Sequence, residues 1–154
     1  MEQDVVISKM TEKDLMPVFN LSNLSSVRAV SFNSEKIELE NHKKWFASKL
    51  DDENTIMLKA EVGEDFAGQV RLSFEGDSAV IGVSVDEQFR GKGIASKLLQ
   101  TAIAVANERS VKVIEAYIKP ENAASTGLFE KNGFVYEDQT EVSGVPANRY
   151  LYKF

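Results

Sequence analysis

The chain has 154 residues, the size of one domain, and its 43% hydrophobic and 27% charged residues are typical of a globular fold. A net charge of −6, from 18 basic and 24 acidic residues, argues against a nucleic-acid-binding protein and against an anionic membrane as partner. The chain has no cysteine and one histidine, His42, so we expect no metal site in a single domain spanning residues 1–154.

The first third of the chain predicts one strand and two helices. Residues 5–7 alternate as in a short strand, and Thr11 with Asp14 three residues later resembles a capping box that begins a helix. Residues 25–38 are polar and mixed, which predicts a loop that can include a helical turn. Residues 39–50 again show helical spacing.

A three-stranded meander is predicted next, over residues 55–62, 66–74 and 78–85. Short glycine-containing turns separate these strands, and short turns favour antiparallel pairing.

The last third predicts two helices and three strands. Apolar residues at three-four spacing indicate a helix over 94–109, and a strand over 111–118 ends before Pro120. A second helix over 122–132 ends at Gly133, and strands follow over 134–142 and 149–154. The element order is that of an α/β fold with a mixed sheet of about seven strands and about four helices.

The N-terminal stretch lacks the basic-then-apolar pattern of a signal peptide. No apolar run approaches the roughly 20 residues of a membrane-spanning helix. We therefore expect a cytoplasmic protein.

One strand-to-helix junction carries the most specific chemical signal. The apolar strand 80–85 leads through Asp86–Phe89 into Arg90-Gly91-Lys92-Gly93, and a helix follows at once. A helix start offers unpaired N–H groups and the positive end of the helix dipole. The glycines allow close approach of a ligand, and the two basic residues add charge, so the run predicts a diphosphate cradle. Neither the Rossmann nor the Walker pattern is complete here.

Two blocks resemble the GNAT family of N-acetyltransferases. Gln88–Ala95 is similar to the family's Arg/Gln-x-x-Gly-x-Gly/Ala signature, and Asn122–Phe134 is similar to its Asn-x-x-Ser/Ala…Leu-Tyr-Glu-Lys-x-Gly-Phe block. They stand in the family's order with a strand between them. The resemblance implies a mostly antiparallel acyl-CoA N-acyltransferase fold. It also implies transfer of an acetyl group from acetyl-CoA to a primary amine by direct attack.

The resemblance also implies which residues hold the coenzyme. The strand before the cradle would carry a bulge, with Gly82 as the candidate position, and would splay from the next strand. Asn122 can equally be a plain helix cap. The implied coenzyme-binding residues are Val83, Ser84, Val85, Arg90, Gly91, Lys92, Gly93, Ile94, Ala95, Ser96, Asn122, Ser125 and Phe129.

The catalytic residues are less determined. The family's usual general acid is a tyrosine, and that position is Phe129, which cannot donate a proton. Three alternatives stay open: another tyrosine donates, the thiolate leaves unassisted, or the protein binds acetyl-CoA without catalysis. The candidate tyrosines are Tyr117, Tyr136, Tyr150 and Tyr152. The candidate bases are His42, Glu87, Ser84 (through a water) and Glu115.

One pattern in the sequence concerns the acceptor of the acetyl group. Val27–Phe32, with Ile37, His42 and Trp45 beyond, resembles a subgroup that acetylates nucleotide-linked amino sugars, as in pseudaminic acid biosynthesis. The resemblance implies that Arg28 meets a phosphate and that His42 lies near the sugar amine. A protein N-terminus, a lysine, an antibiotic amine or a polyamine are the alternatives, and the acidic composition favours the cationic polyamine. Homodimers are common in the family.

Overall fold

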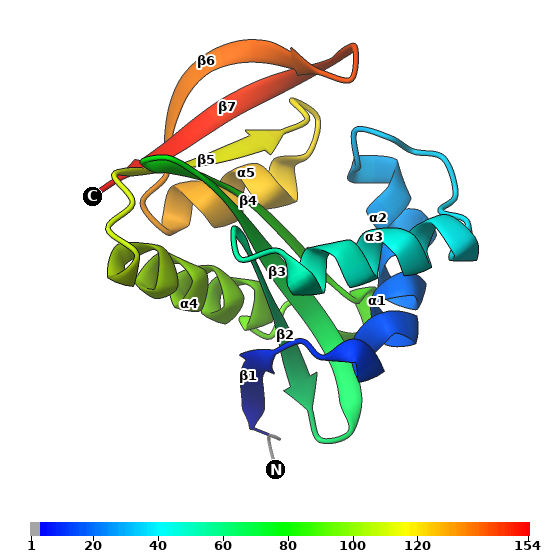
Figure 1. The fold of residues 1–154 in the computed structure, drawn as a ribbon. Helices are drawn as coiled ribbons and strands as arrows, with labels where there is room; N and C mark the ends of the chain where they lie inside the picture. Colours follow the sequence, from blue (N-terminus) through cyan, green and yellow to red (C-terminus); the bar gives the residue numbers. More distant parts are fainter. Residues whose placement is uncertain (1–3) are drawn as a thin grey trace.

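The computed structural model describes residues 4–154, which form one seven-stranded sheet covered by helices on both faces (Figure 1). Residues 1–3, which begin the stretch searched for a signal peptide, lie outside the described residues. Within residues 4–154, no helix is long and apolar enough to cross a bilayer.

The sheet has the strand order β1-β2-β3-β4-β5-β7-β6. Every neighbouring pair is antiparallel except β4 and β5, which confirms the mixed, mostly antiparallel sheet. The strands are β1 (Val5–Lys9), β2 (Thr55–Val62), β3 (Asp65–Glu75), β4 (Ser78–Val85), β5 (Val113–Ile118), β6 (Val135–Val142) and β7 (Val145–Lys153).

Helices α1 to α3 cover one face of the sheet, and α4 and α5 lie on the other (Figure 1). Two short 3-10 turns, η1 (Glu12–Asp14) and η2 (Glu87–Phe89), precede α1 and α4. The helices are α1 (Leu15–Ser22), α2 (Ser25–Val30), α3 (Leu39–Asp51), α4 (Ile94–Glu108) and α5 (Ala123–Lys131).

Adjacent residues of β2 belong to different hydrophobic cores, because successive side chains of a strand point to opposite faces. Leu58 packs into the larger core under α4, where Leu98 and Leu99 are fully buried. Met57 packs into the smaller core under α1 and α3, beside Phe46. The sheet therefore has two distinct sides, and the side of the smaller core also carries Arg71 of β3, since Val70 and Leu72 face α4.

The predicted capping box is confirmed. The Thr11 backbone N–H donates to the Asp14 carboxylate at 2.8 Å, and the Thr11 hydroxyl accepts from the backbone of Lys13. The box opens η1, from which α1 continues. Gly133 ends the last helix with φ +94°, as predicted.

Most predicted bounds agree within about two residues, and two features differ by more than that. Residues 25–30 form the helix α2 rather than a loop, which raises the number of α-helices to five. Its stability comes from tertiary contacts that no local pattern reveals, because Val27 is buried and the Ser31 hydroxyl donates to the Val27 carbonyl. Strand β7 begins at Val145 instead of Arg149. Pro146 is tolerated there because β5 pairs with β7 only from Asn148 onward, so the missing N–H leaves no partner unpaired on that side.

The predicted bulge at Gly82 is wrong, whereas the predicted splay of β4 is confirmed. The register between β3 and β4 runs without a shift through Gly82, which faces Arg71. A backbone without Cβ does not need to bulge, and the pairing with β3 stays regular along the whole strand. On its other side β4 pairs with β5 only from Ser78 to Ile81, so the two strands part beyond that point.

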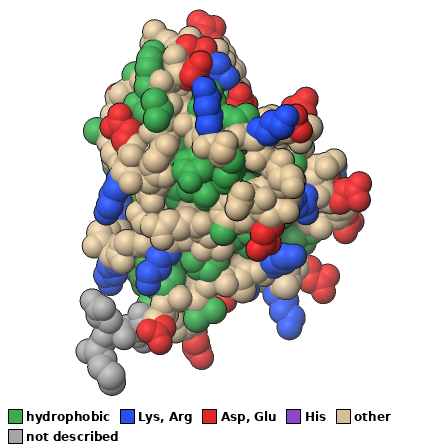
Figure 2. Space-filling view, turned by 90° about the vertical axis from the view of Figure 1, so that its left-hand side faces the viewer, with side chains coloured by type: hydrophobic (Ala, Val, Ile, Leu, Met, Phe, Trp, Pro, Cys, Tyr) green, Lys and Arg blue, Asp and Glu red, His purple; other side chains and the backbone are tan. Residues whose placement is uncertain are grey.

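Acidic and basic side chains are interspersed on the face that Figure 2 shows, and no stripe of one sign crosses it. That face therefore offers no continuous basic track for a nucleic acid.

Candidate functional site

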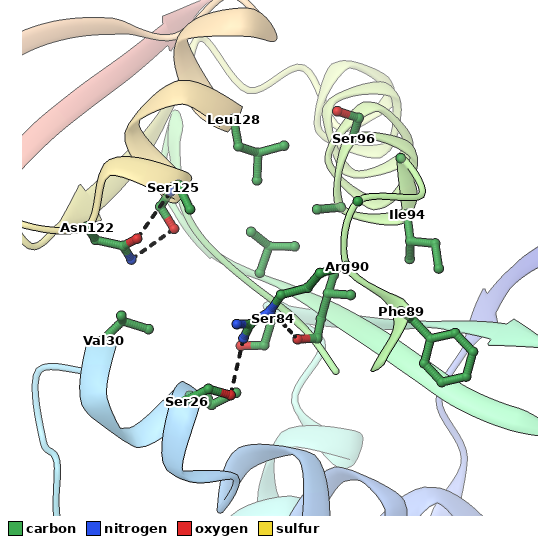
Figure 3. Close-up of a pocket in the computed structure, with 17 residues that line it drawn as sticks. Ser26, Val30, Ser84, Phe89, Arg90, Ile94, Ser96, Asn122, Ser125 and Leu128 are labelled. Atoms are coloured by element: carbon green, nitrogen blue, oxygen red, sulfur yellow. Dashed lines mark hydrogen bonds between the residues drawn. The ribbon is translucent and has the colours of Figure 1, made fainter. Parts of the chain in front are cut away.

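A cleft of about 350 Å³ opens where β4 parts from β5. Its floor is the end of β4, and its walls are the start of α4, the start of α5 and the helix α2 (Figure 3). Residues from both sequence blocks line it together with residues of α2. The lining residues that carry polar groups are Ser26, Ser84, Arg90, Ser96, Asn122 and Ser125.

The turn before α4 holds its shape through two left-handed glycines. Gly91 and Gly93 both have φ +78°, a region that other residues enter at a cost. Gly93 is the N-cap of α4 and provides no side-chain capping bond. The N–H groups of the first helical turn therefore keep their hydrogen-bonding capacity for a ligand. A Cβ at either glycine would meet no atom within 4 Å, so conformation rather than crowding requires glycine at both positions.

Two cations flank this helix start. Arg90 donates from Nε to the Val85 carbonyl at 3.3 Å and from Nη2 to the Ser26 hydroxyl at 3.3 Å, and it lines the cleft (Figure 3). Lys92 is exposed, with its ammonium 5.6 Å from the centre of the Phe89 ring. A helix N-terminus with two adjacent cations is suited to bind a diphosphate.

The start of α5 forms the opposite wall. Asn122 is the N-cap of α5, and its side-chain oxygen accepts from the backbone N–H of Ser125 at 3.2 Å. Its amide also donates to the Ser125 hydroxyl at 3.0 Å, as the dashed lines in Figure 3 show. The helix-cap interpretation of Asn122 is thus confirmed, and the same two side chains line the cleft.

A second cavity of about 450 Å³ lies beside the first and shares Val83, Ser84, Asn122 and Ser125 with it. It lies between α2, the smaller-core side of β3 and β4, and the end of β5. Of the residues that the structure describes, three basic ones line it, Arg28, Arg71 and Lys119, and no acidic one does. A third cavity, of about 310 Å³, adjoins it through Ser22, Arg28 and Arg71, and no acidic residue of the described stretch 4–154 lines it either.

The structure separates the four candidate tyrosines. Tyr117 lines the second cavity, and its hydroxyl donates to Glu115 at 3.4 Å. Burial, followed by the charge of Glu115, raises the pKa of Tyr117. Tyr136 is exposed on the edge strand β6, Tyr150 is buried in the larger core, and Tyr152 packs against Phe134.

Phe129 lies at the edge between the larger core and the second cavity. It is 4% exposed and packs edge-to-face against Phe134 with ring centres 5.0 Å apart. It also lines the second cavity, next to Ser125.

The candidate bases occupy different places. Ser84 lines both cavities. Glu87 lies exposed in η2 and lines neither cavity. Glu115 also lines neither, and its carboxylate accepts from Tyr117 and from Arg149 at 2.9 Å. The structure therefore brings only Ser84 of these three to the junction of the cavities.

His42 is 2% exposed, so it is a buried histidine and not one on the surface of α3. Its Nε2 lies 2.9 Å from the Leu15 carbonyl, and its ring lies among Phe19, Trp45 and Phe46. It lines the third cavity rather than the cleft with the glycine turn.

Most hydrogen-bond donors of the Arg28 side chain are used within the protein. Its guanidinium donates to the carbonyls of Ser22, Asn33 and Glu35 and to the Ser31 hydroxyl, and so holds the loop after α2. Desolvation lowers the pKa of Arg28. Its side chain lines the second and third cavities with most of its donors already in use.

Sequence reasoning missed several residues of these cavities. Ser26 and Val30 lie on α2, which the sequence did not reveal as a helix. Arg71 belongs to the polar side chains on one face of β3, and such a pattern usually predicts a face exposed to solvent. In the folded chain that face borders two cavities beneath the helices.

The sequence matches the acetyltransferase (GNAT) family over residues 18–134, a range that includes both blocks and the cleft between them. The chain belongs to this family. It is an acetyl-CoA-dependent N-acetyltransferase, as the two blocks predict.

The names of similar proteins give the same class. The chain is 32% identical over 133 residues to a candidate phosphinothricin acetyltransferase, YwnH, of Bacillus subtilis, covering 79% of this chain and 78% of the relative. It is 30% identical over 127 residues to the L-methionine sulfoximine/L-methionine sulfone acetyltransferase of Pseudomonas aeruginosa, covering 78% and 73%. A crystal structure of a ribosomal-protein-alanine N-acetyltransferase from Brucella melitensis superimposes with a TM-score of 0.84, at 27% identity and over 97% and 99% of the chains.

Proposed function

We propose that residues 1–154 act as one domain that acetylates the primary amine of a small acceptor with acetyl-CoA as donor. The observation that carries this proposal is the position of the uncapped start of α4. It opens into the same cleft as the free edge of β4, beyond Ile81. A diphosphate binds at the first feature, and an extended ligand can pair with the second as an added strand.

The residues present fit the coenzyme. Gly91 and Gly93 leave open space over the helix start, and Arg90 and Lys92 neutralise charge there. The backbone of Val83 to Val85 would hold the extended arm, although the Val85 carbonyl already accepts from Arg90. Asn122 and Ser125 would contact the coenzyme from the opposite wall. Acetyl-CoA supplies an acetyl group activated as a thioester.

The acceptor would occupy the second cavity, because that cavity meets the first at Ser84 and Ser125. There the chain would orient the amine, which must be neutral to attack a thioester carbonyl. Ser84 would take part in removing the amine proton through a water. The chain has no cysteine, which agrees with direct attack.

Tyr117 would supply the proton that Phe129 cannot. It is the one candidate tyrosine that lines the second cavity, and burial keeps its hydroxyl protonated. His42 and Glu87 remain sequence predictions, and neither lies in the cleft with the glycine turn.

The acceptor class rests on the relatives and on charge. Two relatives carry names that specify amino-acid-like acceptors. The basic lining of the second cavity disfavours a polyamine, contrary to what the acidic composition suggested. The nucleotide-linked amino sugar stays a prediction, and the engagement of Arg28 with four protein acceptors weakens its basis.

The test is thiol release from acetyl-CoA with a panel of amines. The panel comprises L-methionine sulfone, L-methionine sulfoximine, a nucleotide-linked amino sugar, spermidine and a short peptide with a free N-terminus. Release with the amino acids supports the proposal, and release with another class keeps the enzyme but changes the acceptor. Saturable binding of acetyl-CoA by calorimetry with no release for any amine would instead favour a coenzyme-binding module without catalysis.

A further inference from the structure

The guanidinium of Arg71 differs from that of every other arginine in the part of the chain that the structure describes. Arg28, Arg90, Arg109 and Arg149 each donate hydrogen bonds to carbonyl, hydroxyl or carboxylate oxygens. Within residues 4–154 no hydrogen bond or ion pair joins the side chain of Arg71 to another residue, although its backbone pairs with the neighbouring strands. Its five N–H donors are therefore available to a ligand.

Arg71 is accessible and enclosed at the same time. It lines both the second and the third cavity, and its side chain is reached by solvent. The protein atoms around the concave site partly desolvate the guanidinium and lower the pKa of Arg71, which nevertheless stays protonated at neutral pH. A charge held in such a hollow attracts an anion more strongly than one on a convex surface.

The guanidinium of Arg71 lies over the face of an aromatic ring. Its central carbon lies 5.0 Å from the centre of the Trp45 ring on α3. Stacking on an aromatic face leaves the edge of a guanidinium free to form two parallel hydrogen bonds with a carboxylate. The side chain is thus oriented before a ligand arrives.

Space for the anion lies directly beside Arg71. Gly82 is its partner across the β3–β4 pair, and it lines the second cavity. A Cβ at Gly82 would meet no atom within 4 Å. Because β4 begins to part from β5 at this point, the space continues toward Ser84 and the cleft that we assign to the coenzyme.

The charges around this space have one sign. Arg71, Arg28 and Lys119 line the second cavity, and none of the acidic residues within residues 4–154 lines the second or third cavity. Lys119 donates to the Ala29 carbonyl and Arg28 to several carbonyls. Arg71 is therefore the basic residue of this lining whose side-chain donors are all unused within residues 4–154.

We propose that Arg71, stacked on Trp45 and facing the space beside Gly82, binds the carboxylate of an amino-acid acceptor while its amine points toward Ser84. This assignment rests on the proposed function, since it names the acceptor class of the same site. The positive charge of Arg71 would attract an amino acid, because its carboxylate lies next to the reacting amine. The same charge would repel polyamines, which are cationic.

Binding can be followed without turnover, because Trp45 is the single tryptophan of the chain and stacks on Arg71. We would titrate the protein, with coenzyme A present, with L-methionine sulfone and with its carboxamide, and record tryptophan fluorescence. Thiol release from acetyl-CoA would be measured with the same pair. We expect the acid to give a saturable fluorescence change and a KM about 10- to 100-fold below that of the carboxamide, the usual effect of a charge-assisted hydrogen-bond pair.

Arg71→Gln removes the charge and should abolish the preference for the acid over its carboxamide. We expect KM for the acid to rise by about 10- to 100-fold with little change in kcat. Arg71→Lys, which keeps the charge but loses the planar fork, should restore part of the preference. Arg109→Gln is the matched control. That arginine also stacks on an aromatic ring, Phe74 at 4.5 Å, but lies away from these cavities.

The outcomes separate the two proposals. Equal binding of acid and carboxamide, or an acid preference that survives in Arg71→Gln, would overturn the carboxylate site even if thiol is released. An Arg71-dependent signal with a nucleotide-linked amino sugar but none with the amino acid would overturn it in favour of a phosphate. No thiol release for any amine would overturn the proposed function, while an Arg71-dependent preference in fluorescence would still support the site.

Discussion

The Nη2 of Arg90 lies 3.3 Å from the Ser26 hydroxyl, 64 residues earlier in the chain. This bond joins the turn before α4 to α2, and the Nε of Arg90 holds the end of β4 through the Val85 carbonyl. One side chain thereby connects two walls and the floor of the cleft and places a positive charge among them (Figure 3).

Replacing Arg90 by Gln should weaken acetyl-CoA binding by about 10-fold, the usual effect of losing a charge-assisted hydrogen bond. Calorimetry measures this affinity. Ser26→Ala is the control, because it removes the contact to α2 but keeps the charge, and we expect its dissociation constant to change by less than about twofold. Unaltered affinity in Arg90→Gln would show that the guanidinium serves only to hold α2.

The glycines of the turn should matter through backbone conformation. Gly93→Val must place a branched side chain at φ +78°, which costs about 1–2 kcal/mol of folding stability and distorts the helix start. Acetyl-CoA affinity should fall with it. Gly76→Val is the matched control, since Gly76 has φ +59° and open space but lies in the β3–β4 turn, away from the cleft. Equal loss of coenzyme affinity in both variants would contradict the diphosphate assignment.

Phe129→Tyr should preserve the fold and raise kcat. The ring is 4% exposed but borders the second cavity, so we expect the added hydroxyl to reach that cavity and the stability loss to stay below about 1 kcal/mol. Thermal unfolding and thiol release measure the two effects. A loss of about 3 kcal/mol would mean that the hydroxyl is forced into the dry core beside Phe134.

Tyr117→Phe tests the proton donor. We expect kcat to fall by about 10- to 100-fold, in the lower range of general acid catalysis, with acetyl-CoA affinity unchanged. Burial raises the pKa of Tyr117 above the ordinary value of about 10, so the donating, neutral form persists to higher pH than usual. The wild-type kcat should therefore show no decline assignable to this tyrosine between about pH 7 and 10. An unchanged kcat in the variant would leave unassisted departure of the thiolate as the mechanism.

Local patterns predicted the elements that local chemistry controls. The capping box of Thr11 and Asp14 and the helical stop at Gly133 depend on residues within one turn, and both are confirmed. The helix α2 was missed because Leu24 gives it no side-chain cap and its stability comes from Val27 and from contacts made elsewhere in the fold. The bulge at Gly82 was wrong because a glycine allows an irregular backbone without requiring one.

The sequence by itself determined the mixed sheet, the family and the glycine turn before α4. Each of these can be predicted from patterns of residues that are close together in the chain. Only the tertiary structure decided which charged side chains keep donors available to a ligand. In the folded chain His42 is buried among aromatic rings and Arg28 donates to backbone carbonyls. Arg71, on the polar face of β3, lines a cavity. The reason is physical: whether a charged side chain is free to bind depends on the hydrogen-bond acceptors that distant segments bring to it.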